Sequence, residues 1–341
     1  MEKIQGLKDL RCLVLDKGLC SACGACIGGC PYLTAFRGKT LVLDECAVEH
    51  GRCFAACPVV SSDPSEIIRD LFGESRPVTG LGIYYSVLAS RAVDQQIVAK
   101  AQGGGTVTAL MAHSIDQGMI DCAILTGSSQ DSDYPGGVIA ETPDDVMACA
   151  GSNYIGAHSL SALRTAIDKG RQAIGIVGLP CQVLAIRKMV QTDLKQERLG
   201  TRIKFVVGLF CNWAFSAREF MDFLTQRYSL KDIKRIHIPP PPANRLDVET
   251  IGGIESVPLD EVRHLIQESC RHCQDMTSEF ADISVGMFEG RPSWNTLIVR
   301  TDQGRQLIDR LVKQGILETE VFPQSNLAHL ESACHRKKTR T

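Results

Sequence analysis

AIGIVGLPCQVLAIRKMV, residues 173–190, is an apolar run that passes through Gly-Leu-Pro into a helical pattern. The run predicts a buried strand over 173–178 and a helix from about 181 to 191. The chain repeats this alternation, with further strands predicted over 82–90, 121–127, 204–210, 246–250, 254–257, 281–286 and 296–301, and further helices over 106–118, 159–169, 217–228 and 303–314. Strands that alternate with helices of about 10–15 residues are typical of parallel sheets covered on both faces. We therefore expect an α/β fold with a mostly parallel or mixed sheet flanked by helices.

The first 75 residues differ from the rest in composition, because eight of the 15 cysteines lie before residue 58. A short helix over 65–72, with Asp63 as its N-cap and Pro64 at its first position, is expected to close this unit. GESRPVTG, residues 73–80, predicts a linker. We therefore expect a cysteine-rich module over 1–75, an α/β domain over 80–322 and a loose polar tail over 323–341.

The composition excludes several classes of protein. With 44 % hydrophobic and 22 % charged residues the chain is an ordinary globular one, and 37 basic against 39 acidic residues leave no basic excess for nucleic-acid binding. The longest apolar runs, near 173–186 and 203–215, are shorter than the roughly 20 residues that span a bilayer. The first residues show no secretory signal, so we expect a cytoplasmic chain without a transmembrane segment. In that reducing compartment, 15 cysteines indicate metal or redox chemistry rather than disulfides.

A ferredoxin-type motif, C-x2-C-x2-C-x3-C-P, lies near the start of the chain. It comprises Cys20, Cys23, Cys26, Cys30 and Pro31, with small residues between most of the cysteines. In bacterial ferredoxins the first three cysteines of this run bind one cluster and the fourth binds the other. A zinc knuckle or a chance grouping is the alternative, but all the spacings and the proline match the ferredoxin pattern.

A second motif repeats the last half of the first. Cys53, Cys57 and Pro58 match it, whereas its first half is one cysteine short and offers Cys46 and His50. The crossed-ligand rule assigns one centre to Cys20, Cys23, Cys26 and Cys57, and a second to Cys30, Cys46 and Cys53. The second centre is then a 3Fe–4S cluster, a 4Fe–4S cluster completed by His50 or Cys12, or absent. We favour a ferredoxin-like module with two clusters, the first 4Fe–4S and the second 4Fe–4S or 3Fe–4S.

Four cysteines of the α/β part form a third group. Cys181 and Cys211 each follow a predicted strand, and adjacent parallel strands would bring their carboxyl ends together. Cys270 and Cys273 add a C-x2-C pair. Four thiolates are enough for one more 4Fe–4S cluster, while a zinc site and buried structural cysteines are the alternatives.

A glycine run opens the helix predicted over 106–118. In QGGGTVTAL, residues 102–110, three glycines let backbone amides and the helix N-terminus approach an anion or a flat ring, although a turn without a ligand has the same pattern. Three of the remaining cysteines have no partner spacing. We expect Cys122 and Cys149 to be core residues and Cys334 to be inert in the tail.

Six stretches occur in an order that resembles the beta subunit family of coenzyme F420 hydrogenases and dehydrogenases. They are QGGGTVTAL (102–110), AGSNYIGAHSL (150–160), GLPCQVLAIRK (178–188), GLFC (208–211), CRHCQDMTSEFADISVG (270–286) and WNTLIVRTDQG (294–304). The resemblance covers about residues 1–320, and the stretch over 270–286 is long and specific.

The resemblance implies an oxidoreductase that binds FAD in the α/β domain beside a proximal 4Fe–4S cluster. Carried onto this chain, the ligands of that cluster are Cys181, Cys211, Cys270 and Cys273. The residues implied to contact the flavin are Gln102, Gly103, Gly104, Gly105, Thr106, Thr108, Ser152, Asn153, Tyr154, Gly178 and Pro180. No side-chain acid or base is implied as a catalytic residue, because hydride moves between ring faces held by the protein.

The reaction that the resemblance implies is hydride transfer between coenzyme F420 and FAD. Electrons would then pass singly through the clusters to or from a hydrogenase, formate dehydrogenase or heterodisulfide-reductase-like subunit. One alternative is a ferredoxin-dependent flavoprotein reductase of another organic acceptor. The other is a non-catalytic electron-relay subunit that keeps the clusters and has lost the use of flavin.

Overall fold

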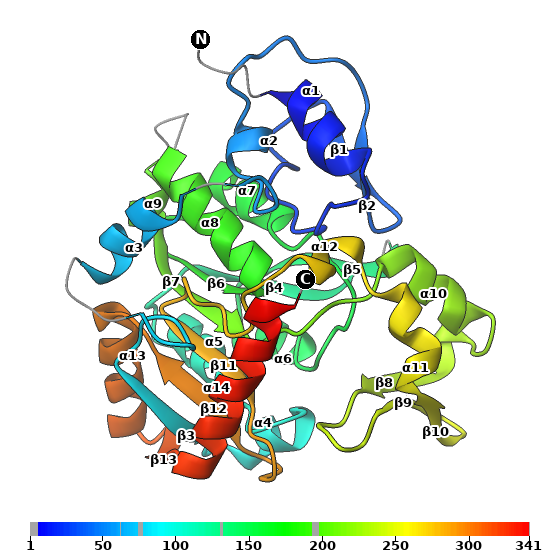
Figure 1. Ribbon diagram of the computed structural model, residues 1–341. Helices are drawn as coiled ribbons and strands as arrows, with labels where there is room; N and C mark the ends of the chain where they lie inside the picture. Colours follow the sequence, from blue (N-terminus) through cyan, green and yellow to red (C-terminus); the bar gives the residue numbers. More distant parts are fainter. Residues whose placement is uncertain (1–5, 62, 74–77, 130–131, 193–197, 341) are drawn as a thin grey trace.

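The computed structural model describes residues 6–61, 63–73, 78–129, 132–192 and 198–340 (Figure 1). The largest element of the described part is an eight-stranded sheet. Its strands are β3 (Ser86–Ala92), β4 (Cys122–Ser129), β5 (Ser132–Ala140), β6 (Ile174–Gly178), β7 (Ile203–Leu209), β11 (Ile283–Met287), β12 (Asn295–Val299) and β13 (Leu317–Val321). Across the sheet they follow the order β13-β3-β12-β11-β7-β6-β4-β5.

The middle of the sheet is parallel and its two sides are antiparallel. β4, β6, β7 and β11 pair in parallel, while β5 on one side and β12, β3 and β13 on the other pair antiparallel. Every residue of β6 is buried, as expected for a central strand covered on both faces. The expected α/β fold with a mixed sheet flanked by helices is therefore confirmed. Because β6 and β7 are neighbours, their carboxyl ends meet at one edge.

Helices cover both faces of this sheet. On one face lie α5 (Thr106–Asp116), α6 (Pro143–Ala148) and α13 (Asp302–Lys313), and on the other lie α7 (Ser161–Asp168) and α8 (Pro180–Thr192). Successive side chains of a strand point to opposite faces. β6 therefore sends Val177 to the α5 side, and Ile174 and Ile176 to the side of α7 and α8. Cys122 is fully buried in the second of these cores and Cys149 packs against the first, as expected.

A smaller antiparallel sheet forms a separate lobe. It consists of β8 (Ile233–His237), β9 (Arg245–Thr250) and β10 (Gly253–Pro258), and it packs with α10 (Ala217–Thr225) and α11 (Leu259–Val262). Phe215 stacks on Phe220 at a ring-centroid distance of 4.4 Å within this core. The remaining short elements of the α/β part are α4 (Gln95–Lys100), α9 (Leu199–Arg202), η2 (Leu230–Asp232), η3 (Arg263–Leu265) and α12 (Glu268–Arg271).

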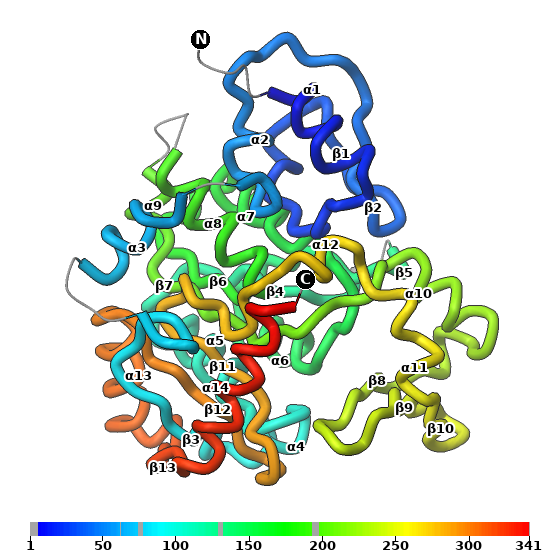
Figure 2. Tube along the Cα trace, in the orientation of Figure 1, coloured from blue at the N-terminus to red at the C-terminus, as the bar shows by residue number. Residues whose placement is uncertain are grey.

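The N-terminal module sits over α7 and α8, as Figures 1 and 2 show. Its elements are α1 (Leu7–Leu10), η1 (Arg11–Leu15), β1 (Leu33–Phe36), β2 (Lys39–Val42), α2 (Arg52–Ala55) and α3 (Ser65–Phe72). The Leu160 amide donates to the Cys23 carbonyl at 3.1 Å. Gly24 has a φ of +87°, and a Cβ there would lie 2.6 Å from the His158 carbonyl oxygen. Only glycine fits this close approach, so the module and the α/β domain are in direct backbone contact.

The described part of the tail is a helix rather than a loose segment, which corrects the expectation for residues 323–340, and residue 341 lies outside the described residues. α14 (Gln324–Thr339) crosses the sheet at the front of Figure 1 and ends beside α12. Cys334 is 2 % exposed, and its cluster includes Ile298 of β12. Although the segment is polar overall, one narrow face of the helix packs against the domain. The side chains on that face, at helical spacing, are Leu327, Leu330, Cys334 and Lys337.

The boundaries expected from the sequence agree only in part with the structure. The helix predicted over 65–72 is confirmed as α3, but its N-cap is Pro64, and Asp63 instead accepts a hydrogen bond from the Ser65 amide at 2.9 Å. Residues 74–77 of the expected linker lie outside the described residues. β5 lies outside the strands predicted from the sequence, and its Pro and Gly residues are tolerated because it is an edge strand. No helix in the described ranges combines the length and the apolar character needed to cross a membrane.

Candidate functional site

The first cysteine group lies inside the N-terminal module. Cys20, Cys23, Cys26 and Cys57 line one small cavity of about 20 Å³. Burial raises the pKa of the Cys23 thiol to about 12, and the neighbouring Cys57 and Cys20 contribute to the rise. The four side chains that the crossed-ligand rule joins are therefore brought together. Their role as ligands stays a prediction.

The second group lies on the other side of Cys26. Cys30, Cys46 and Cys53 line a larger cavity of about 210 Å³, which Cys26 also lines. Burial raises the pKa of Cys53 to about 11, and Cys30 and Cys46 contribute to the rise. Among the described residues that line this cavity there is no fourth cysteine for a second centre beyond Cys26.

Neither of the two residues that the sequence offers as that fourth ligand lines this cavity. His50 and Cys12 are both exposed, and neither is among the described residues lining the cavity. Three thiolates match the ligand set of a cluster that lacks one iron. The type of the second centre stays a prediction.

The third group is assembled by the parallel strands. Cys181 opens α8 directly after β6, Cys211 follows β7, and Cys270 lies in α12. The Cys270 sulfur accepts a hydrogen bond from the Ala214 amide at 3.3 Å. Burial raises the pKa of Cys211 to about 12, and the Lys337 ammonium is the strongest opposing influence. Cys270 and Cys273 both act on the pKa of Cys181 and of Cys211, which indicates that the four thiols are close together.

The first and third groups are neighbours. After burial, Cys23 is the group that most raises the pKa of Cys181. Cys23 also belongs to the apolar core beneath α7 and α8. Cys26 lines both cavities of the module, so the first group also borders the second. The order is therefore the group of Cys181 in the α/β domain, then the group of Cys23, then the group of Cys53.

Buried cations that the sequence did not single out lie at these groups. Lys188 donates to the Cys57 carbonyl at 2.6 Å and to the Val60 carbonyl at 3.0 Å. Lys337 donates to the carbonyl of Cys211 at 2.6 Å and to that of Asp275 at 2.7 Å. The only sequence signal was the position of Lys188 on the helix after Cys181, and Lys337 fell in the tail predicted to be loose.

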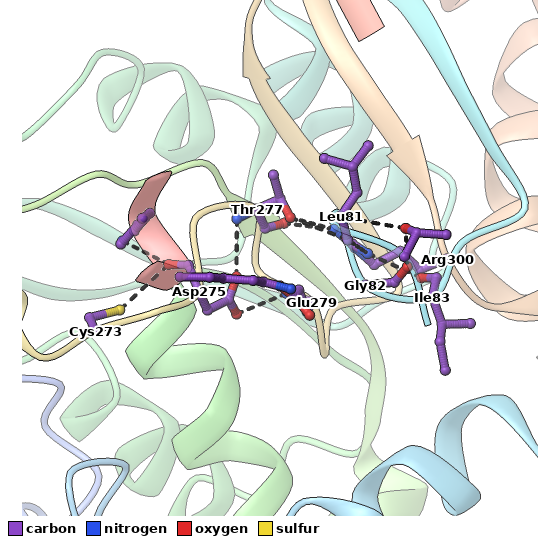
Figure 3. A network of polar contacts seen from close by, with 11 residues as sticks. Leu81, Gly82, Ile83, Cys273, Asp275, Thr277, Glu279 and Arg300 are labelled. Atoms are coloured by element: carbon purple, nitrogen blue, oxygen red, sulfur yellow. Dashed lines mark hydrogen bonds and ion pairs between the residues drawn. The ribbon is translucent and has the colours of Figure 1, made fainter. Parts of the chain in front are cut away.

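A network of buried polar groups holds the loop that follows Cys273 (Figure 3). The Asp275 carboxylate accepts hydrogen bonds from the Thr277 amide at 3.0 Å and the Glu279 amide at 2.9 Å. Arg300, which is fully buried, donates to the carbonyls of Leu81, Ile83 and Thr277 and to the hydroxyls of Ser284 and Thr277. Burial raises the pKa of Asp275, while Arg300 and Lys337 oppose the rise.

The glycine run is packed against two strands. A Cβ on Gly104 would lie 2.7 Å from the Ser90 carbonyl oxygen and 2.8 Å from the Asn295 side chain. Thr106 hydrogen-bonds the Ser90 hydroxyl at 2.9 Å inside the core, whereas Thr108 is half-buried. The glycines thus serve close packing of this loop on β3 and β12.

The other residues predicted to contact the flavin lie in three places: at the end of β8, in the turn after β6, and on the surface. Gln102 donates to the Ile236 carbonyl at 2.7 Å, and the Tyr154 hydroxyl accepts from the Ile238 amide at 3.2 Å. Both therefore meet the same end of β8. Gly178 and Pro180 are buried in a turn where Gln182 accepts from the Leu179 amide at 2.8 Å, while Ser152 and Asn153 are exposed.

The donor sets fit the groups that the motifs suggest. No set of three or more His, Cys, Asp or Glu side chains in the described ranges is arranged to hold a single metal ion. The thiolates of a cubane bind different iron atoms, so their sulfurs are farther apart than the ligands of one ion. For a flavin, the Gln102 Oε1 atom is a buried acceptor without a hydrogen-bond partner among the described residues.

Two family models match the chain. Residues 87–164 match the model described as coenzyme F420 hydrogenase/dehydrogenase, beta subunit N-term, and residues 171–325 match the model for the C terminus of that same beta subunit. Together they cover more than half of the chain.

Curated relatives and a solved structure carry related names. The coenzyme F420 hydrogenase subunit beta of Methanothermobacter thermautotrophicus is 30 % identical over 76 % of this chain and 93 % of that protein. The coenzyme F420-dependent sulfite reductase of Methanocaldococcus jannaschii is 29 % identical over 95 % of this chain and 52 % of that protein. One protein chain from the F420-reducing [NiFe] hydrogenase of Methanosarcina barkeri superimposes with a TM-score of 0.72 at 28 % identity, covering 78 % of this chain and 92 % of that chain.

Proposed function

The chain belongs to the coenzyme F420 hydrogenase/dehydrogenase beta subunit family, which confirms the resemblance, and from this we propose that it is an iron–sulfur flavoprotein acting as one subunit of an F420-linked oxidoreductase. Its relatives are oxidoreductase subunits. A bound flavin would exchange hydride with coenzyme F420 and single electrons with iron–sulfur clusters, which makes it the converter between the two kinds of transfer.

The observation that carries this proposal is the proximity of Cys23 and Cys181. One belongs to the N-terminal module and the other to the α/β domain, yet after burial Cys23 is the group that most raises the pKa of the Cys181 thiol, and the Leu160 amide donates to the Cys23 carbonyl at 3.1 Å. A line of cysteine groups that begins in the α/β domain and continues through the module supports electron passage between them. In this proposal Cys181, Cys211, Cys270 and Cys273 hold the proximal 4Fe–4S cluster, and the module holds the other two centres.

The glycine loop supports a flavin at the same edge of the sheet. Gln102 is fixed by its bond to Ile236, which leaves Oε1 buried and able to accept from a ligand N–H or O–H group. The Tyr154 hydroxyl accepts from the Ile238 amide at the same strand end. We propose that these two residues, with the backbone of Gly103–Gly105, orient the ring system.

The second cavity supports electron exchange with a partner protein. It is lined by residues of the module together with Leu160 and residues of α7, α8 and α9. Its cysteines form the last of the three groups in the order that begins at Cys181. A hydrogenase, formate dehydrogenase or heterodisulfide-reductase-like subunit fits this role. The match of nearly the whole chain to part of the F420-dependent sulfite reductase favours, as a second candidate, a reductase centre as the electron acceptor.

The test is a direct assay of the anaerobically purified chain after reconstitution with iron, sulfide and FAD. We expect bound flavin, bleaching of its absorbance by reduced coenzyme F420, and reduction of a viologen dye at the expense of reduced F420. Iron and sulfide analysis of the same sample separates iron–sulfur clusters from zinc.

The other outcomes identify the alternatives. A chain with clusters and no bound flavin would be an electron-relay subunit. Flavin that is reduced by a ferredoxin but not by reduced F420 would indicate a reductase of another organic acceptor. Either result contradicts the proposal.

A separate prediction concerns the missing ligand. We expect His50→Ala to leave the iron content and the EPR spectrum of the oxidised chain unchanged, because His50 is exposed and is not among the described residues that line the second cavity. Cys46→Ser is expected to remove the signal of the second centre and to spare that of the first. Loss of the 3Fe–4S signal, or its appearance only in His50→Ala, would show that His50 is a ligand after all.

A further inference from the structure

We propose that the C-terminal helix α14 is a positioning element of the third cysteine group, in which Lys337 and Arg340 clamp the peptide segments bearing Cys211, Cys270 and Cys273 and set the reduction potential of the cluster there. This inference rests on the proposed function, since it concerns the proximal cluster. It assigns a role to a segment that the matched family models, which end at residue 325, leave almost wholly uncovered.

Two cations of α14 and its end reach all three segments. Lys337 donates to the carbonyls of Cys211 and Asp275, at 2.6 and 2.7 Å. Arg340 donates to the carbonyls of Cys270, of Cys273 at 3.2 Å and of Asn212 at 3.2 Å. The carbonyls of three of the four proposed ligands therefore accept a hydrogen bond from one of two side chains.

The helix is held firmly enough to position these cations. Lys337 is only 4 % exposed, and Cys334 one turn before it is buried in the core. Lys338 pairs with Glu279 at 2.7 Å, and His329 lies 2.8 Å from the Glu289 carboxylate near the start of the helix. α14 is thus anchored along its length, and the loop after Cys273 is bound to it.

The charged side chains beside the third cysteine group carry a net positive charge, which favours an anion there. Lys337, Lys338, Arg300 and Arg340 are four cations, and Asp275 and Glu279 are the two carboxylates among them, which leaves two positive charges in excess. Four thiolates around an oxidised 4Fe–4S core carry about two negative charges. The Arg340 Nε atom is also buried without a hydrogen-bond partner among the described residues. The chemistry of the site therefore matches an anionic cluster.

Positive charge stabilises the reduced cluster more than the oxidised one, because the reduced form carries one more electron. Removing either cation should therefore lower the potential. A buried, desolvated charge acts more strongly than an exposed one, since water screens the exposed group.

The test uses the reconstituted full chain and EPR-monitored redox titration of the signal that Cys181→Ser removes. We expect Lys337→Gln to shift the reduction equilibrium at least tenfold toward the oxidised cluster, about 59 mV for a one-electron couple. Lys337→Arg should restore most of the wild-type potential. Arg340 lies just after the end of α14, so its replacement leaves the helix itself unchanged. Arg340→Gln therefore tests the same role even if Lys337→Gln fails to fold.

The matched control is Arg336→Gln, because Arg336 is exposed on the same helix and its hydrogen bond to Ser332 stays within α14. Its potential should equal that of the wild type. An unchanged potential in both Lys337→Gln and Arg340→Gln, or an equal shift in Arg336→Gln, would overturn the role of α14. If Cys181→Ser removes no signal, the proposed function itself fails, and this result is distinguishable from the other two.

Discussion

Replacing Cys181 with serine is expected to abolish electron transfer from reduced coenzyme F420 to a viologen dye while leaving hydride uptake by the flavin intact. Cys181 is the member of the third cysteine group whose pKa Cys23 of the N-terminal module raises, so its loss interrupts the proposed path between the two groups. Substituting a residue that only hydrogen-bonds to a metal ligand typically lowers metal affinity or activity about 10–100-fold. Loss of a ligand itself should therefore lower the rate of dye reduction by at least about 100-fold.

The two half-reactions are measured on one sample. Flavin bleaching by reduced F420 reports hydride transfer, and dye reduction reports the clusters. Cys12→Ser is the matched control, because Cys12 is exposed and has no role in any of the three groups. Full dye reduction by Cys181→Ser would show that electrons leave the flavin by another route, and loss of bleaching as well would place Cys181 at the flavin.

Replacing Arg300 with methionine is expected to lower the free energy of unfolding by about 3–5 kcal/mol, the cost of removing one member of a buried charged network. The side chain is fully buried and donates five hydrogen bonds that tie Leu81, Ile83 and Ser284 to the loop after Cys273 (Figure 3). Methionine removes these five hydrogen bonds from buried oxygen atoms, and it leaves Asp275 and Glu279 with less positive charge nearby.

Urea unfolding of the metal-free chain, followed by circular dichroism, measures this effect without any cofactor. Arg305→Met is the control, since Arg305 is an exposed arginine paired with Asp302 on the surface. Its effect should stay below about 1 kcal/mol, as for other exposed ion pairs. A loss of less than about 1 kcal/mol in Arg300→Met would mean that the network around Asp275 is dispensable for the fold.

The cysteine spacings alone specify the grouping of the thiols within the module. Cys20, Cys23 and Cys26 lie within seven residues, so short loops bring them together whatever surrounds them. The alternation of strands and helices likewise predicts β6 and β7, because apolar runs of this length are buried wherever the sheet forms. Placing Cys181 and Cys211 after these two strands was enough to predict that they meet.

The tertiary structure alone decides what lies beside each group. Nothing local relates Cys23 to Cys181, or Lys337 to Cys211, because these pairs are separated by more than a hundred residues. α14 looked loose since its apolar stripe is narrow and its burial depends on a core built by β12 and Leu81. Local spacing thus determines which thiols can share a centre. Long-range packing decides the order of the centres and the charge around them, because burial and distance, which set the strength of every electrostatic contact, exist only in the folded chain.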